Sequence, residues 1–85
     1  MAVKGSAFSL WPNPSTNTFW FSALDQRETL VYYRIFDVQG SLTRVGQAFL
    51  PGPVQVDVSG LAGGLYFLEI AGEADHELLK FVILQ

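Results

Sequence analysis

Hydrophobic residues recur at every second position in several short segments of this chain, and turn-forming residues separate the segments. The pattern is clearest in residues 18–22, 31–35, 54–58 and 65–70, which are rich in β-branched and aromatic side chains. A period of two is typical of β-strands, because successive side chains of a strand point to opposite faces. Gly, Pro, Asn and Asp supply the turns between them. The alternation therefore predicts a protein built from short strands.

Seven strands follow from the spacing of the turns. The only helical candidate, residues 74–80, is short and runs into the apolar residues 81–84. Short strands with turns at this spacing are typical of antiparallel two-sheet proteins. We therefore expect an all-β, Ig-like antiparallel β-sandwich of about seven strands and no helix. The expected strands cover residues 6–11, 17–23, 30–37, 41–50, 53–58, 64–71 and 77–84.

Polar residues within the strands indicate which side chains face the core. Arg34, Gln55, Asp57 and Glu69 are expected to face water, so that the residues beside them face inward. The expected inward set is Val31, Tyr33 and Ile35 in the third strand, Val54, Val56 and Val58 in the fifth, and Tyr66, Leu68 and Ile70 in the sixth.

The length of 85 residues allows one small domain. The chain has no cysteine, which excludes disulfides and thiolate metal sites, so its seven Phe, two Trp and three Tyr must supply much of the core. No signal-peptide pattern opens the chain. We expect residues 6–85 to form the domain and residues 1–5 to be an expression start and linker.

Charge and hydropathy argue against two classes of function. Five basic and eight acidic residues give a net charge of −3, and the basic residues are scattered. Nucleic-acid binding needs a basic stripe that neutralises phosphates. No apolar run approaches the roughly 20 residues of a transmembrane helix. We therefore expect neither nucleic-acid binding nor a membrane span.

Two loops have structural explanations. Residues 37–40 fit a hairpin turn, in which Asp37 accepts hydrogen bonds from backbone N–H groups two residues on and Gly40 takes the left-handed position. The run Leu61-Ala62-Gly63-Gly64-Leu65-Tyr66 fits a tyrosine corner, in which the phenol bonds a backbone group a few residues upstream. Both patterns predict structural roles.

The chain offers little for catalysis. Its single histidine, His76, lies in an acidic segment, residues 73–77, expected at a solvated hairpin end. One histidine cannot form a His-based metal cage, and no EF-hand spacing of carboxylates is present. We expect no enzyme activity, no catalytic residue, no metal site and no cofactor.

Four motifs in order resemble a known family. They are PNPST before the second strand, YRIFDVQG, VQVDVSGLAGGLYFLEI, and LLKFVILQ at the end. The set resembles the C-terminal sorting domain, type A, of the type IX (Por) secretion system of Bacteroidetes, from about Phe8 to Leu84. Three positions depart from the family pattern: Asn17 in place of a frequent Gly, Ser41 in place of a frequent Lys or Arg, and a less basic end. The matching family-motif positions are Pro12, Asn13, Pro14, Asp37, Gly40, Leu61, Gly64, Tyr66, Lys80 and Val82.

The resemblance implies a secretion signal. Such a tail follows a cargo domain, is recognised by the outer-membrane translocon, and is removed by a surface sortase. The cargo is then linked to anionic lipopolysaccharide or released. The implied location is the periplasm in transit, and then the cell surface or the extracellular space.

Two other functions compete with this one. An accessory carbohydrate-binding module could use Trp11, Trp20 and Tyr32 as a stacking platform, although we favour core filling for these aromatics. An adhesive Ig-like module could dimerise by strand pairing, since unprotected edges and the apolar residues 81–84 suit strand addition.

Overall fold

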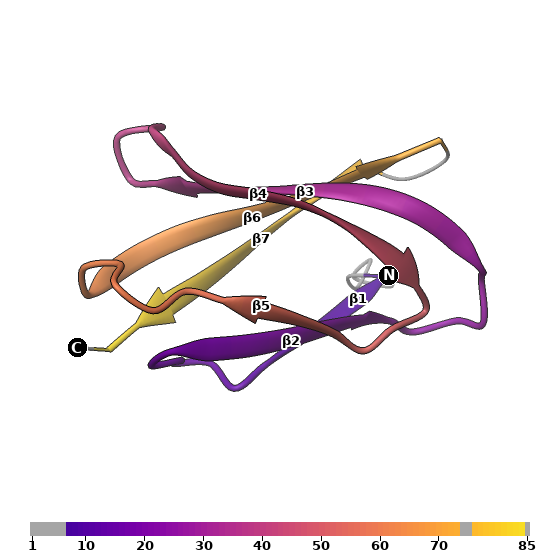
Figure 1. The fold of residues 1–85 in the computed structure, drawn as a ribbon, viewed down its shortest axis with the longest axis horizontal. Coiled ribbons are helices and arrows are strands. Elements are labelled where there is room, and N and C mark those ends of the chain that lie inside the picture. The colour runs from indigo at the N-terminus through magenta and orange to yellow at the C-terminus, as the bar shows by residue number, and fades with distance from the viewer. Residues whose placement is uncertain (1–6, 74–75, 85) are drawn as a thin grey trace, which may run out of the picture.

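The computed structural model describes residues 7–73 and 76–84, which form seven strands in two antiparallel sheets (Figure 1). One sheet has the strand order β1-β2-β5 and the other the order β4-β3-β6-β7. The two sheets are the lower and upper layers of a sandwich in Figure 1. The strands are β1 (Phe8–Trp11), β2 (Thr18–Ala23), β3 (Thr29–Asp37), β4 (Leu42–Leu50), β5 (Val54–Asp57), β6 (Gly64–Gly72) and β7 (His76–Ile83).

The predicted all-β, Ig-like sandwich of seven strands is confirmed. Each strand lies where the alternation placed it, with ends shifted by at most two residues. As expected, the helical candidate forms no helix in its described part, because His76 to Lys80 belong to β7; residues 74 and 75 lie outside the described part. The predicted linker, residues 1–5, also lies outside it.

The core fills the space between the sheets with the inward side chains of both. The rings of Phe19 in β2 and Phe81 in β7 meet across it, with centroids 4.7 Å apart. The inward faces predicted for β3, β5 and β6 are confirmed, since most of those side chains are buried and Tyr33 and Val54 pack against the core. The fully buried large side chains are Phe19, Phe21, Phe81, Ile35, Leu68, Ile70, Ile83, Val31, Val56 and Val58.

No helix that could cross a membrane occurs among residues 7–73 and 76–84. Consecutive strands of the same sheet form hairpins, as in β1-β2, β3-β4 and β6-β7, while the other connections cross between the sheets. These connections determine which turns lie together at each end of the sandwich.

Candidate functional site

The segment Pro12–Thr16, which we call the clasp, leaves β1 and lies against the last strand. The Val82 N–H donates to the Asn13 side-chain oxygen at 3.0 Å. The Ser15 N–H donates to the Val82 carbonyl at 2.8 Å, and the Leu84 N–H donates to the Ser15 carbonyl at 2.7 Å. Ser15 is fully buried, and its hydroxyl donates to the Pro12 carbonyl. The first motif of the chain is therefore bound to the last one.

The clasp covers part of an exposed sheet edge. β7 is the edge strand of its sheet, and an edge presents unpaired backbone groups that invite a foreign strand. The clasp bonds these groups at Val82 and Leu84, while Phe81 and Ile83 face the core. The prediction of an unprotected edge at residues 81–84 is therefore wrong, because a segment distant in the sequence pairs with it. The other edge of this sheet is β4.

The β3–β4 turn has the predicted arrangement. The Asp37 carboxylate accepts hydrogen bonds from the N–H groups of Gln39 and Ser41, each at 2.9 Å. The Gly40 N–H donates to the Asp37 carbonyl at 3.0 Å, and Gly40 has a φ of +84°. A left-handed φ is costly for a residue with a β-carbon. Asp37 and Gly40 thus build the turn together.

The loop before β6 contains the predicted tyrosine corner. The Tyr66 hydroxyl donates to the Ala62 carbonyl at 2.6 Å, four residues upstream. Its ring is buried and stacks on that of Phe81, with centroids 5.9 Å apart and an angle of 28° between planes. The Leu61 N–H donates to the Val58 carbonyl at 3.2 Å. The corner therefore holds the start of β6 against β7.

The motif that departs from the family at Asn17 keeps its structure. Asn17 has a negative φ, so it needs none of the freedom of glycine. Its carbonyl accepts a hydrogen bond from the Val58 N–H at 2.9 Å, which joins the residue after the clasp to the residue after β5.

Strand register brings the four motifs to one end of the sandwich. Asp37 lies opposite Tyr66, and Tyr66 lies opposite Phe81. Leu65 lies opposite Val82, which holds the clasp. Figure 1 shows the β3–β4 turn, the start of β6 and the C-terminus at the same end. We call this end, formed by the ten family-motif positions named above, the motif end.

The opposite end receives the N-terminal part of the chain. The Leu24 N–H donates to the Ala7 carbonyl at 2.9 Å, and the Ala7 N–H donates to the Glu77 carboxylate at 3.1 Å. Leu24 follows the last residue of β2, and Glu77 lies near the first residue of β7, whose other end carries the clasp. Ala7 therefore lies away from the motif end.

His76 belongs to an ion-pair network that the sequence did not reveal. Its Nε2 lies 2.8 Å from one Glu69 oxygen, and the other oxygen accepts from Arg34 Nε at 2.6 Å. The hydrogen bond from His76, followed by Arg34, lowers the pKa of Glu69. Arg34 and Glu69 were both predicted to face outward, and the pairing of β3 with β6 places them side by side. Within the described residues, no three His, Asp or Glu side chains gather closely enough to hold a metal ion.

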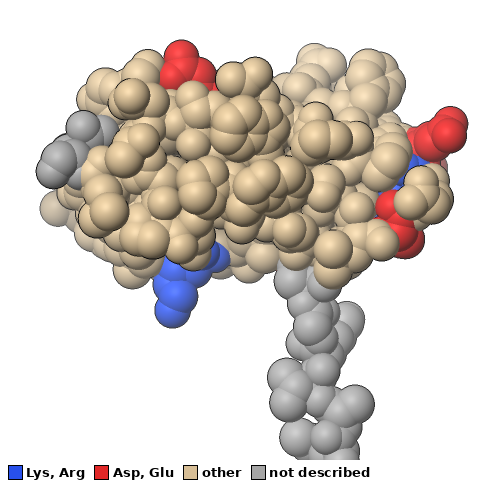
Figure 2. Space-filling model, turned by 90° about the horizontal axis from the view of Figure 1, so that it is seen from below, with Lys and Arg blue, Asp and Glu red and all other residues tan. Residues whose placement is uncertain are grey.

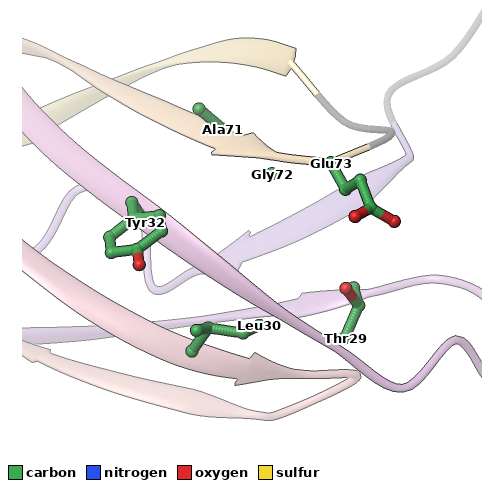
Figure 3. Close-up of a pocket in the computed structure, with 6 residues that line it drawn as sticks. All are labelled: Thr29, Leu30, Tyr32, Ala71, Gly72 and Glu73. Carbon is green, nitrogen blue, oxygen red and sulfur yellow. The ribbon is translucent and has the colours of Figure 1, made fainter.

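A shallow hollow of about 520 Å³ lies away from the motif end (Figure 3). It is lined where β3 begins and β6 ends, by Thr29, Leu30, Tyr32, Ala71, Gly72 and Glu73. None of these residues is a family-motif position. The hollow therefore does not belong to the candidate site.

Trp11, Trp20 and Tyr32, for which core filling was favoured, do not lie in the core. Trp20 points outward between the buried Phe19 and Phe21, and Trp11, opposite it, is 40% exposed. Tyr32 is 53% exposed and lies on the other sheet. The platform of three aromatics does not form either, because the two tryptophans and Tyr32 lie on opposite outer faces of the sandwich.

Comparison with known proteins identifies a family. A family model described as the secretion system C-terminal sorting domain matches residues 9–84, which is most of the chain. No curated protein matches. This family consists of sorting signals and not of catalysts. All ten family-motif positions fall within the matched residues, and the chain therefore belongs to the family of type IX secretion C-terminal sorting domains.

Proposed function

We propose that this domain directs a cargo protein, attached before Ala7, across the outer membrane of a bacterium of the Bacteroidetes, as a type A sorting domain. The translocon recognises the motif end, and a surface sortase then removes the domain. The cargo passes through the periplasm and reaches the cell surface or the medium. Family membership supports export, since a type IX sorting signal implies delivery toward the outside of the cell.

The observation that carries the proposal is the convergence of the family motifs. Most of their contacts are structural: Asp37 builds a turn, Tyr66 a corner and Asn13 a clasp. Asn13, Pro14 and Lys80 nevertheless remain exposed at this end. A partner that binds here meets residues from three strands and three loops that are assembled only in the folded domain. Recognition of this end therefore selects a folded tail.

The position of the cargo also fits this mode of recognition. Ala7 lies at the end of the sandwich away from the motif end. A partner on the motif end therefore leaves the cargo free to precede the domain without a steric conflict.

A reporter fusion tests the proposal. A signal peptide, a fluorescent reporter and residues 1–85 are joined in this order and expressed in a type IX-competent bacterium. We expect the reporter on the cell surface or in the medium, and in the periplasm when the domain is deleted. Mass spectrometry of the exported reporter tests the sortase step. If a sortase acts, the mass of the exported protein should show that the domain has been removed. Export of the intact fusion would overturn the cleavage step alone.

A further inference from the structure

Two tryptophans and a glutamine form one row across the outer face of the three-stranded sheet. Trp11 in β1 lies opposite Trp20 in β2, and Trp20 lies opposite Gln55 in β5. Residues directly opposite one another in a sheet point to the same face. Phe19 and Phe21 point inward and are fully buried, so the row points outward. The domain thus places both of its tryptophans on one surface.

Folding leaves much of this aromatic surface in contact with water. Trp11 is 40% exposed and Trp20 is half-buried. Burial of large aromatic side chains contributes strongly to the core of a small domain, and their exposure in a contiguous patch is typical of a binding surface. The row Trp11–Trp20–Gln55 is therefore available to a ligand.

Polar side chains suited to hydroxyl groups surround the tryptophans. Gln55 is exposed, and its amide both donates and accepts hydrogen bonds. Ser9 and Ser22 lie opposite each other in one neighbouring row, and Thr18 lies in the other. With strands about 4.8 Å apart, the row of three side chains is roughly 10 Å long. That length accommodates two adjoining sugar rings, each with an apolar face for an indole and hydroxyls at its rim.

Charge selects the class of ligand. Figure 2 looks onto the molecule from below in the view of Figure 1 and shows uncharged side chains across the middle, with charged ones at the margins. Asp57 lies opposite Thr18, and hydrogen bonds from Ser59 lower its pKa, first from the side chain and then from the N–H at 2.8 Å. A carboxylate kept ionised at the margin repels an anionic chain. The surface therefore favours a neutral sugar.

The outer face of the other sheet has a different character. Its exposed apolar side chains include Leu42, Val45, Phe49 and Leu78, and the ion pair of Arg34 with Glu69 lies among them. This face has no pair of neighbouring indoles, whereas the row on the three-stranded sheet combines flat indoles with amide and hydroxyl groups, which suit a pyranose. We propose that Trp11, Trp20 and Gln55 bind a neutral polysaccharide, independently of the sorting function.

Affinity electrophoresis of the 85-residue chain tests this proposal. Native gels contain a soluble β-glucan, an α-glucan, a mannan or a xylan, each with a gel free of polysaccharide as reference. We expect at least one polysaccharide to retard the protein. Trp11→Ala and Gln55→Ala should each weaken binding, with the dissociation constant rising about tenfold for the loss of one stacked ring. Tyr32→Ala is the matched control, because it removes an exposed aromatic from the opposite face.

Tryptophan fluorescence gives a second measurement on the same samples, since both tryptophans of the chain lie in the row. The retarding polysaccharide should shift the emission of the wild-type protein, and thermal unfolding should show that each variant remains folded. The proposal is overturned if none of the four polysaccharides retards the protein. It is equally overturned if Trp11→Ala binds as well as the wild type, or if Tyr32→Ala weakens binding as much as Trp11→Ala. If the translocon binds this surface instead, the wild-type protein binds no polysaccharide and Trp11→Ala abolishes secretion of the reporter fusion. That result also overturns the proposal.

Discussion

Asn13 and Val82 lie 69 positions apart in the chain and are joined by a hydrogen bond of 3.0 Å from the Val82 N–H to the Asn13 side-chain oxygen. Both are family-motif positions, at opposite ends of the sequence. The bond joins Asn13 to the last strand, β7. The nearby Ser15 adds two backbone hydrogen bonds, one with Val82 and one with Leu84. A motif that reads as a stiff turn therefore also closes an edge of the sheet.

Replacing Asn13 by Ala removes the acceptor for the Val82 N–H. A single net hydrogen bond contributes about 1 kcal/mol, so we expect the free energy of unfolding to fall by about that amount. Hydrogen exchange at the Val82 amide should accelerate while amides of β3 remain protected. Chemical denaturation and exchange measured by NMR check both effects.

Asn13→Asp is the informative comparison, because its carboxylate keeps an acceptor at the same place. Gln26→Ala, which removes an exposed amide from the β2–β3 loop, is the control. Unchanged Val82 exchange in Asn13→Ala would show that the clasp does not protect this edge in solution.

Gly40 tests the geometry of the β3–β4 turn. Apart from Gly40 and the two residues beside it in the chain, no atom lies within 4 Å of an added β-carbon. A substitution there therefore introduces mainly the conformational cost of a φ of +84°. We expect Gly40→Ala to lower the free energy of unfolding by about 1 kcal/mol, and Gly40→Asn to lower it less, because asparagine adopts left-handed φ more readily. Equal stability of Gly40→Ala and the wild type would contradict this conformation.

Tyr66→Phe isolates the hydroxyl of the tyrosine corner. The ring remains to stack on Phe81, while the hydrogen bond to the Ala62 carbonyl is lost. Water can reach the exposed Ala62, so we expect a loss of only about 1 kcal/mol in unfolding free energy. Tyr32→Phe, at an exposed position, should change it by less than about 0.5 kcal/mol. The melting temperature of Tyr66→Phe should therefore be lower than that of Tyr32→Phe. Equal melting temperatures would rule out a stabilising tyrosine corner.

Contacts between residues close in the sequence could be predicted from it, and contacts between residues distant in the sequence could not. The bonds of Asp37 and Tyr66 span four residues or fewer, so turn chemistry was sufficient to predict them. The bond of Asn13 depends on the course of every strand between it and Val82. Trp20 was misassigned to the core because it stands between two other large aromatics, Phe19 and Phe21. The residues that share its outer face, Thr18 and Ser22, are polar but carry no charge, so they mark that face only weakly. The pair of Arg34 and Glu69 required the strand order, which alternation alone does not give.

The Glu69 network predicts a specific dependence of stability on pH. The hydrogen bond from His76, with Arg34, lowers the pKa of Glu69 in the folded protein. A lowered carboxyl pKa contributes stability above the pKa of the unfolded chain, and this contribution is lost as the pH falls through the folded pKa. We expect the wild-type protein to lose more stability than Glu69→Gln when the pH is lowered through that range. Parallel curves of unfolding free energy against pH would contradict the assignment.

The claim that export machinery recognises the motif end is tested most directly by the ratio of extracellular to periplasmic reporter in two charge-matched variants. Lys80→Gln lowers the net charge by one at the motif end. Gln47→Glu lowers the net charge by the same amount at an exposed position of β4, opposite Tyr32. With both variants folded, we expect a several-fold lower ratio for Lys80→Gln and the wild-type ratio for Gln47→Glu. Equal ratios in the two variants, or a folded wild-type tail that leaves its reporter in the periplasm, would contradict the account.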